Sequence, residues 1–141
     1  MTPPVGAASL VVTMSGSSDP ATIIALERAA LDRWGRGDPS GFLEISSSDV
    51  TYFDPTMERR LDGLEALTRL YEGIRGQIHV DRYEMLQPKV QLCGNAAVLT
   101  FNLVSYCGEK IFRWNCTEVY QNTTGRWQII QTHWSFTQSV Q

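Results

Sequence analysis

Asp54 is the first residue of the sequence whose type and position suggest acid–base chemistry. It stands where a short predicted strand, residues 50–53, ends at the dipeptide Asp54-Pro55. The aromatic neighbours Tyr52 and Phe53 would remove water from this carboxylate and so favour its acting as a proton acceptor. An aspartate before a proline also commonly starts a turn, and the sequence leaves both interpretations open.

Glu118 is the second candidate, because it lies in the middle of a predicted strand. A carboxylate that faces the interior of a fold needs a partner, since burying an unpaired charge is costly. Two carboxyls that face one cavity can divide the roles of acid and base. The alternative for Glu118 is an ion pair with Arg59, Arg60 or Arg113.

Aromatic residues and one histidine on the last strands are further candidates for binding a ligand. Trp114, Tyr120 and Trp134 can line a pocket for a flat molecule, although aromatic residues in sheets also commonly form the core. Strand alternation places His133 on the face opposite Trp134. One of these two would therefore line the pocket, while the other would lie against a partner subunit.

The composition excludes several classes of protein. With 141 residues, of which 43% are hydrophobic and 19% charged, the chain has the size and core of one ordinary domain. A formal charge of −3 without a basic stripe argues against a nucleic-acid partner. No apolar run approaches the roughly 20 residues that span a membrane. Two distant histidines and three cysteines without C-x-x-C spacing predict no metal and no cofactor.

Residues 1–19 do not match the pattern of a secretory signal peptide. Residues 1–19 lack the basic region and apolar stretch of a secretory signal, and we expect a flexible tail there. A single domain is expected over residues 20–138. The reduced cysteines and the absence of a signal predict a cytoplasmic protein.

Helical patterns come first along the chain. Asp19-Pro20 can begin a helix, because aspartate caps and proline suits the first turn. A helical period then repeats on one face at Ile23, Ile24, Glu27, Ala30, Leu31 and Trp34. A short helix is predicted over 39–45, a loop over 46–49 and a third helix over 62–74.

Beyond Gly76 the apolar period changes to two, which predicts strands over 79–92, 96–107, 110–121 and 126–137. Helices followed by an antiparallel meander indicate an α+β fold. Both faces of the last three strands carry apolar residues, and the helices can cover only one of them. A second copy of the sheet is the simplest cover for the other, so we expect a homodimer or a larger even oligomer.

Three segments resemble the nuclear-transport-factor-2-like superfamily, a cystatin-like fold. They are 33–55 (RWGRGDPSGFLEISSSDVTYFDP), 62–74 (DGLEALTRLYEGI) and 113–135 (RWNCTEVYQNTTGRWQIIQTHWS). The third resembles the association domain of calcium/calmodulin-dependent kinase II and the free-standing SnoaL-like proteins. The resemblance covers about residues 20–137 and implies a cone: a curved, mainly antiparallel sheet wrapped around three N-terminal helices.

The resemblance also implies roles for single residues. Ketosteroid isomerase, a member of the superfamily, uses an aspartate before a proline as its base, and Asp54-Pro55 matches that position. Its oxyanion-holding tyrosine falls on Ala30, which cannot donate a hydrogen bond, so steroid isomerisation is not supported. Its protonated aspartate falls on Thr117 or Glu118, depending on where a gap is placed.

The kinase association domain points three arginines into its cone, and this chain departs from that pattern. The matching positions here are Asn102, Glu118 and Trp134, so an anion-binding pocket of that kind is not expected.

Together these patterns predict a homo-oligomeric protein whose cone binds a small, mostly apolar or aromatic molecule. Asp54 and Glu118 are the candidate catalytic residues for cofactor-free isomerase, cyclase or hydratase/dehydratase chemistry. The candidate ligand contacts are Tyr52, Asn102, Trp114, Glu118, His133 and Trp134. The alternative is a non-catalytic assembly or ligand-sensing module.

Overall fold

The computed structural model describes residues 18–137. Its helices are α2 (Asp19–Gly35), α3 (Ser40–Glu44) and α4 (Leu64–Glu72). Its strands are β1 (Ser46–Phe53), β2 (Leu61–Asp62), β3 (Arg82–Cys93), β4 (Ala96–Cys107), β5 (Lys110–Thr123) and β6 (Arg126–Phe136). Almost all of the tail predicted over residues 1–19 lies outside the described residues, as does the last residue of the domain predicted over 20–138.

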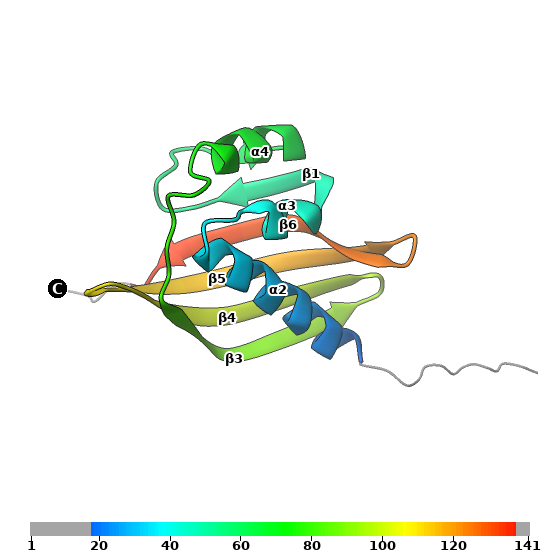
Figure 1. The fold of residues 1–141 in the computed structure, drawn as a ribbon. Coiled ribbons are helices and arrows are strands. Elements are labelled where there is room, and N and C mark those ends of the chain that lie inside the picture. The colour runs from blue at the N-terminus through cyan, green and yellow to red at the C-terminus, as the bar shows by residue number, and fades with distance from the viewer. Residues whose placement is uncertain (1–17, 138–141) are drawn as a thin grey trace, which may run out of the picture.

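The six strands form one sheet in the order β2-β1-β6-β5-β4-β3. Strand β1 runs parallel to β6, whereas every other neighbouring pair is antiparallel. The sheet curves, and α2 lies across its inner face in front of the long strands (Figure 1). The predicted α+β class and the curved, mainly antiparallel sheet are therefore confirmed, and the one parallel pair makes the sheet a mixed one.

The N-terminal elements differ in detail from the sequence prediction. Ser18, not Asp19, caps α2, since its hydroxyl accepts a hydrogen bond from the Ala21 amide at 3.4 Å. The predicted loop over 46–49 is the first half of β1, because β6 lies alongside it and pairs Ser46 with Ile129. The short β2 has no signal in the sequence; it forms where the chain folds back against β1.

Side chains alternate between the two faces of the sheet, and the inner face carries the core. Leu99, Phe101 and Tyr120 are among the inward residues, each no more than 5% exposed. Ile129 and Thr132 are both buried although they are three residues apart. A register shift between the partners of Val119 and Tyr120 makes this possible, since the extra residue of a bulge turns the strand without breaking the ladder.

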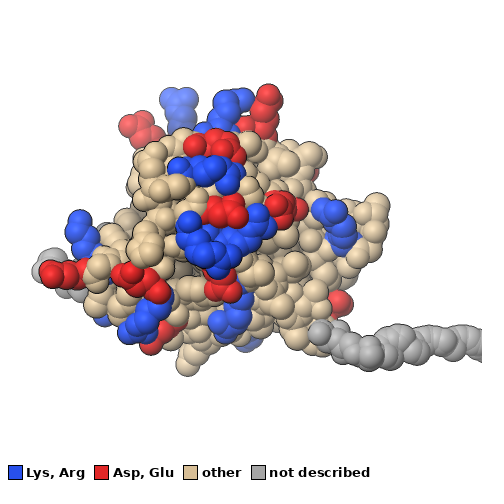
Figure 2. All heavy atoms as spheres, viewed as in Figure 1, with Lys and Arg blue, Asp and Glu red and all other residues tan. Residues whose placement is uncertain are grey.

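Charged side chains of both signs are interspersed over the helix-bearing side of the molecule (Figure 2). Part of this surface is a network that ties the end of α2 to α3 and to the segment after α4. Arg33 contacts Asp38 at 2.8 Å and Glu44 at 2.8 Å, and Arg75 contacts Asp38 at 3.0 Å and Glu72 at 2.6 Å. The hydrogen bond from Arg33, followed by that from the Ser40 amide, lowers the pKa of Asp38.

Replacing Asp38 with asparagine should lower the melting temperature at pH 7 and have less effect in acid. Because the folded pKa of Asp38 is depressed, its stabilisation is present above the unfolded value and disappears as the pH falls through the folded one. Asparagine keeps an acceptor for the Ser40 amide, which lies 3.0 Å from Asp38 Oδ1, but its amide nitrogen cannot accept from Arg33 Nε, so the variant removes the charge together with that ion-pair bond.

Thermal unfolding from about pH 2 to 8 tests this, with Glu58→Gln as the control. Glu58 is exposed and makes no ion pair with the residues that the structure describes. A difference between Asp38→Asn and the wild type that stays constant with pH would show that the carboxylate charge is not what stabilises this corner.

Candidate functional site

Two carboxyl groups lie fully buried between α2 and the inner face of the sheet. Glu27 and Glu118 are each 0% exposed. The Tyr120 hydroxyl donates to Glu27 Oε1 at 2.6 Å, and the Thr132 hydroxyl donates to Glu118 Oε1 at 2.5 Å. The second oxygen of each carboxyl, Oε2, has no hydrogen-bond donor among residues 18–137.

Burial dominates the electrostatics of this pair. Loss of water raises the pKa of Glu27, and it raises the pKa of Glu118 well above the ordinary value, with the negative charge of Glu27 adding to the second effect. Among the described residues, no arginine forms an ion pair with the carboxyl group of Glu27 or of Glu118. Arg60 pairs with Asp62 at 2.6 Å, and Arg113 is an exposed residue of β5.

Cys116 is the third buried group of this cluster. Its sulfur and one oxygen from each glutamate all lie within 4.8 Å of one another, a spacing from which a divalent cation could be held. The sequence prediction of no metal rests on two distant histidines, the cysteine spacing and the lack of a paired carboxylate motif, and a cluster of three residues far apart in the sequence falls outside those patterns. Burial raises the pKa of the Cys116 thiol, so it is a neutral thiol here, whereas Cys93 is exposed.

Asp54 lies at the end of β1 and accepts three hydrogen bonds. The Thr56 amide and the Thr56 hydroxyl each donate to its Oδ1 at 2.7 Å, and the Tyr52 hydroxyl donates to its Oδ2 at 2.9 Å. Asp54 thus starts the turn that its position before Pro55 predicts. It is also tied into the interior through Tyr52, which is only 5% exposed.

Tyr52 and Tyr71 connect the two carboxyl sites. Their rings meet edge to face with centroids 5.7 Å apart. Burial, followed by the charge of Asp54, raises the pKa of Tyr52, and burial raises the pKa of Tyr71. The charge of Glu118 contributes to both shifts, which places the tyrosines within its electrostatic reach. Tyr52 pairs with Thr132, which pairs in turn with Glu118, so Tyr52 and Glu118 share the inner face of the sheet, and the half-buried Asp54 is joined to that face through the Tyr52 hydroxyl.

Aromatic side chains close the interior at the end where Asp54 lies. Trp114 and Trp134 pack edge to face with centroids 5.7 Å apart, and Phe136 lies 4.4 Å from Trp114. All three are half-buried. The Trp114 indole donates to the Ser105 hydroxyl at 3.3 Å. These residues form an apolar rim above the buried polar cluster.

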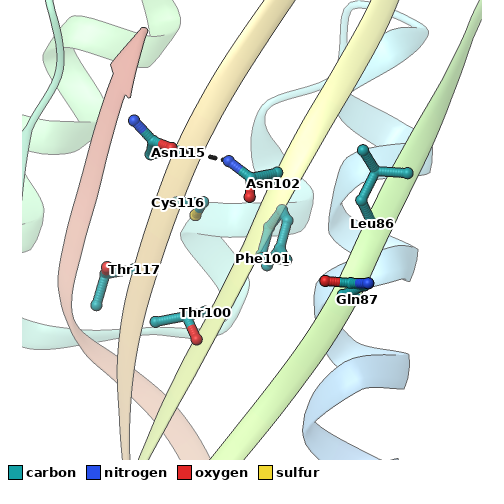
Figure 3. Close-up of a pocket in the computed structure, with 8 residues that line it drawn as sticks. All are labelled: Leu86, Gln87, Thr100, Phe101, Asn102, Asn115, Cys116 and Thr117. Carbon is teal, nitrogen blue, oxygen red and sulfur yellow. Dashed lines mark hydrogen bonds between the residues drawn. The ribbon is translucent and has the colours of Figure 1, made fainter. Parts of the chain in front are cut away.

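Two of the predicted ligand contacts lie on the other side of the sheet. Asn102 is exposed on the outer face and donates to Asn115 Oδ1 at 2.8 Å beside a hollow of about 240 Å³ (Figure 3). His133 is exposed on the same face, with its ring 5.0 Å from that of Phe53. One pocket cannot include Asn102 or His133 together with Glu118, because strand alternation separates them by the thickness of the sheet.

The sequence analysis did not select Glu27, although a signal for it exists. A glutamate within the apolar helical period of residues 23, 27, 30, 31 and 34 indicates a charged group aimed at the core. The ambiguity between Thr117 and Glu118 is resolved in favour of an inward Glu118, since Thr117 pairs beside His133 on the outer face. Ala30 is buried, and it supplies no hydrogen-bond donor.

Replacing Tyr52 with phenylalanine should destabilise the fold by about 1–3 kcal/mol, because it removes a part-buried hydrogen bond from a buried tyrosine to a carboxylate. Urea unfolding at pH 7 measures this. Tyr83→Phe is the matched control: the Tyr83 hydroxyl also donates to an aspartate, Asp32, at 2.7 Å, but at the surface. Equal losses in the two variants would contradict an interior role for the bond between Tyr52 and Asp54.

Known structures share this architecture. A candidate ketosteroid isomerase from Parabacteroides distasonis is 47% identical, with 86% of this chain and 89% of that one covered and a TM-score of 0.79. The CaMKII hub of S. rosetta is 17% identical over 87% and 100% of the two chains, with a TM-score of 0.72. A candidate dehydratase of the NTF2-like family from Streptomyces avermitilis is 18% identical over 86% and 97%, with a TM-score of 0.68.

No protein of curated function matches this chain in sequence. None of the helices described is long and apolar enough to cross a membrane. The model of the SnoaL-like domain matches residues 23–139, which include every helix and strand except the first turn of α2. The chain belongs to the SnoaL-like family and has the fold of NTF2-like proteins.

Proposed function

We propose that this protein is a cofactor-free acid–base enzyme that acts on a small, mostly apolar carbonyl compound. The observation that carries the proposal is a pair of carboxyl groups: Asp54, which is hydrogen-bonded to the buried Tyr52, and the fully buried Glu118, on the face of the sheet that also holds Trp114 and Trp134. Burying carboxyl groups without a cation lowers stability, so their retention is better explained by chemistry than by folding. The candidate isomerase and candidate dehydratase among the related structures support the same class of reaction.

The two carboxyls would have different roles. Asp54, oriented by Tyr52 and Thr56, would accept the proton from the carbon next to the substrate carbonyl. Glu118, held protonated by burial, would donate its proton to the carbonyl oxygen in an isomerisation or to the leaving hydroxyl in a dehydration. Both reactions are redox-neutral: the first returns the proton to a more distant carbon, and the second releases water.

The half-buried ends of Trp114, Trp134 and Phe136 are where the ligand would enter. Contact with their faces would orient an apolar ring, as aromatic side chains offer large apolar area with few rotatable bonds. Tyr52 lies deeper, next to Asp54. The predicted contacts Asn102 and His133 belong to the outer face and have no part in this proposal.

Two probes with the same product test the proposed activity. The β,γ-unsaturated isomer of cyclohexenone would isomerise and β-hydroxycyclohexanone would dehydrate, and both give conjugated cyclohexenone, which ultraviolet absorbance detects. The wild type should accelerate at least one reaction over buffer. Asp54→Asn should lose roughly 10²- to 10⁴-fold in rate, the usual contribution of a general base.

Asp62→Asn is the control, because Asp62 is an exposed residue of β2 paired with Arg60. It should retain the wild-type rate. Equal rates for the wild type and Asp54→Asn with both probes would contradict Asp54 as the base.

A second candidate function, assembly through the outer face of the sheet, has its own support. The outward residues in the middle of β4, β5 and β6 carry no formal charge at neutral pH: Val98, Thr100, Asn102, Asn115, Thr117, Val119, Gln131, His133 and Ser135. Depletion of charge is typical of interface centres. The hub and association-domain structures that share this fold also support oligomerisation.

Light scattering at micromolar concentration should give at least twice the chain mass of 15.8 kDa. Thr117→Arg would place a charge in the centre of the outer face and should give monomers, since an unpaired buried charge costs several kcal/mol. Glu58→Arg, at an exposed loop position, should leave the mass unchanged. A monomeric wild type would remove the assembly hypothesis and leave the proposed enzyme untouched.

A further inference from the structure

The two unpaired oxygens of the buried glutamates require an explanation beyond their hydroxyl donors. Glu27 comes from α2 and Glu118 from β5, and each already receives one hydroxyl proton, from Tyr120 and Thr132 respectively. The remaining oxygens, Glu27 Oε2 and Glu118 Oε2, are buried and have no donor among the described residues. A buried polar atom without a partner costs about 1–3 kcal/mol, and more if it is charged.

Three arrangements that bring in nothing beyond a cation or a proton would satisfy both oxygens at once. Two carboxylates could hold a cation together with Cys116, two neutral acids could donate to each other, or one acid could donate to one carboxylate. For a cation to bind, the ligand atoms of Glu27, Cys116 and Glu118, which lie up to 4.8 Å apart, would have to move together around it. The buried Cys116 thiol would also have to lose its proton. Two neutral acids would forgo the charge-assisted hydrogen bond that Tyr120 gives to Glu27.

We propose that Glu27 and Glu118 share a single proton, which Glu118 carries and donates to the Glu27 carboxylate. Every oxygen then has a partner: Glu27 accepts from Tyr120 and Glu118, and Glu118 accepts from Thr132 while donating to Glu27. The donated bond is of the strong, charge-assisted kind. Like charges this close also prevent both groups from ionising together.

Glu27 is thereby a positioning residue that keeps Glu118 a neutral acid at pH 7. This role in catalysis rests on the proposed function, whereas the shared proton does not. When a ligand is bound, the Glu118 O–H would turn from the Glu27 carboxylate to a carbonyl or hydroxyl oxygen of the ligand, because a neutral carboxylic acid has one hydrogen to donate. The site would therefore select uncharged oxygen-bearing substrates over anions, which Glu27 would repel.

The number of protons that the folded pair holds is directly measurable from stability. Above about pH 5, unfolded glutamates are ionised, so each proton retained by the folded state makes the folding equilibrium constant fall about tenfold per pH unit. The wild type is compared with the double variant Glu27→Gln/Glu118→Gln, whose two amides keep the size of the side chains and can pair with each other. Urea unfolding of both proteins from pH 5.5 to about 8 gives the two slopes.

The folding equilibrium constant of the wild type should fall about tenfold more per pH unit than that of the double variant, which corresponds to one retained proton. A difference of two protons would mean that both acids are neutral, and a difference of zero would mean that both are ionised; either result overturns the proposal. Infrared spectroscopy of the wild type at pH 7 supplies a second measurement that needs no variant. It should show the C=O stretch of a protonated carboxylic acid, shifted in D₂O and absent from Glu118→Gln.

Elemental analysis separates the remaining possibility. One metal ion per chain, together with loss of the C=O band, would show that a cation occupies the cluster and would contradict the shared proton. None of these measurements uses catalysis. If the stability measurements give one retained proton but neither cyclohexenone assay shows acceleration, the proposed enzymatic activity is contradicted and the shared proton between Glu27 and Glu118 is not.

Discussion

The contact between α2 and β5 through two buried carboxyls is the constraint around which the interior is arranged. Glu27 has no exposed surface and reaches across to Tyr120 and Glu118. Burying a charge between a helix and a sheet is unfavourable unless hydrogen bonds compensate it, so the position of α2 depends on these partners. An apolar pair at the same place would avoid the free-energy cost of desolvating two carboxyls, which is consistent with the role proposed for them.

The polarity of the side chains on the inner face changes along the length of the strands. Toward the start of α2 this face carries Tyr120 and Ile129, in its middle Glu118 and Thr132, and at the far end the rim of Trp114 and Trp134. In the proposed function, a ligand that enters at the rim would meet apolar surface first and polar groups only where water is excluded. In a dry interior hydrogen bonds are electrostatically stronger, which favours proton transfer over simple binding.

The two faces of one sheet thus suit different purposes. The helices cover the inner face, where the proposed site lies, while the outer face presents uncharged polar residues such as Asn102 and Thr117 to solvent or to another chain. The sequence analysis treated the outer face as apolar, whereas its centre is a ladder of amides and hydroxyls, including the bonds from Asn102 to Asn115 and from Asn115 to Ser135. Catalysis and assembly can therefore coexist in this scaffold without sharing residues.

The sequence by itself determined most helices and strands and, for many residues, the face of the helix or strand on which each lies. Period-two alternation from residue 79 onward predicted the four long strands, because each strand has one buried face, and it placed Glu118 on the face opposite Thr117. Strand ends and caps were less certain, as at Ser46, where pairing with β6 extends β1 into a segment that is polar and loop-like on its own.

Only the tertiary structure decided which buried groups meet. Tyr120 and Glu27 are 93 residues apart, and no local pattern states that a glutamate on a helix will face one on a strand. The bulge that turns both Ile129 and Thr132 inward is likewise a property of the pairing between β5 and β6. Periodicity specifies which side of an element is buried; what lies across the core follows from the register and curvature of the whole sheet, and at this site those two features bring the carboxyls together.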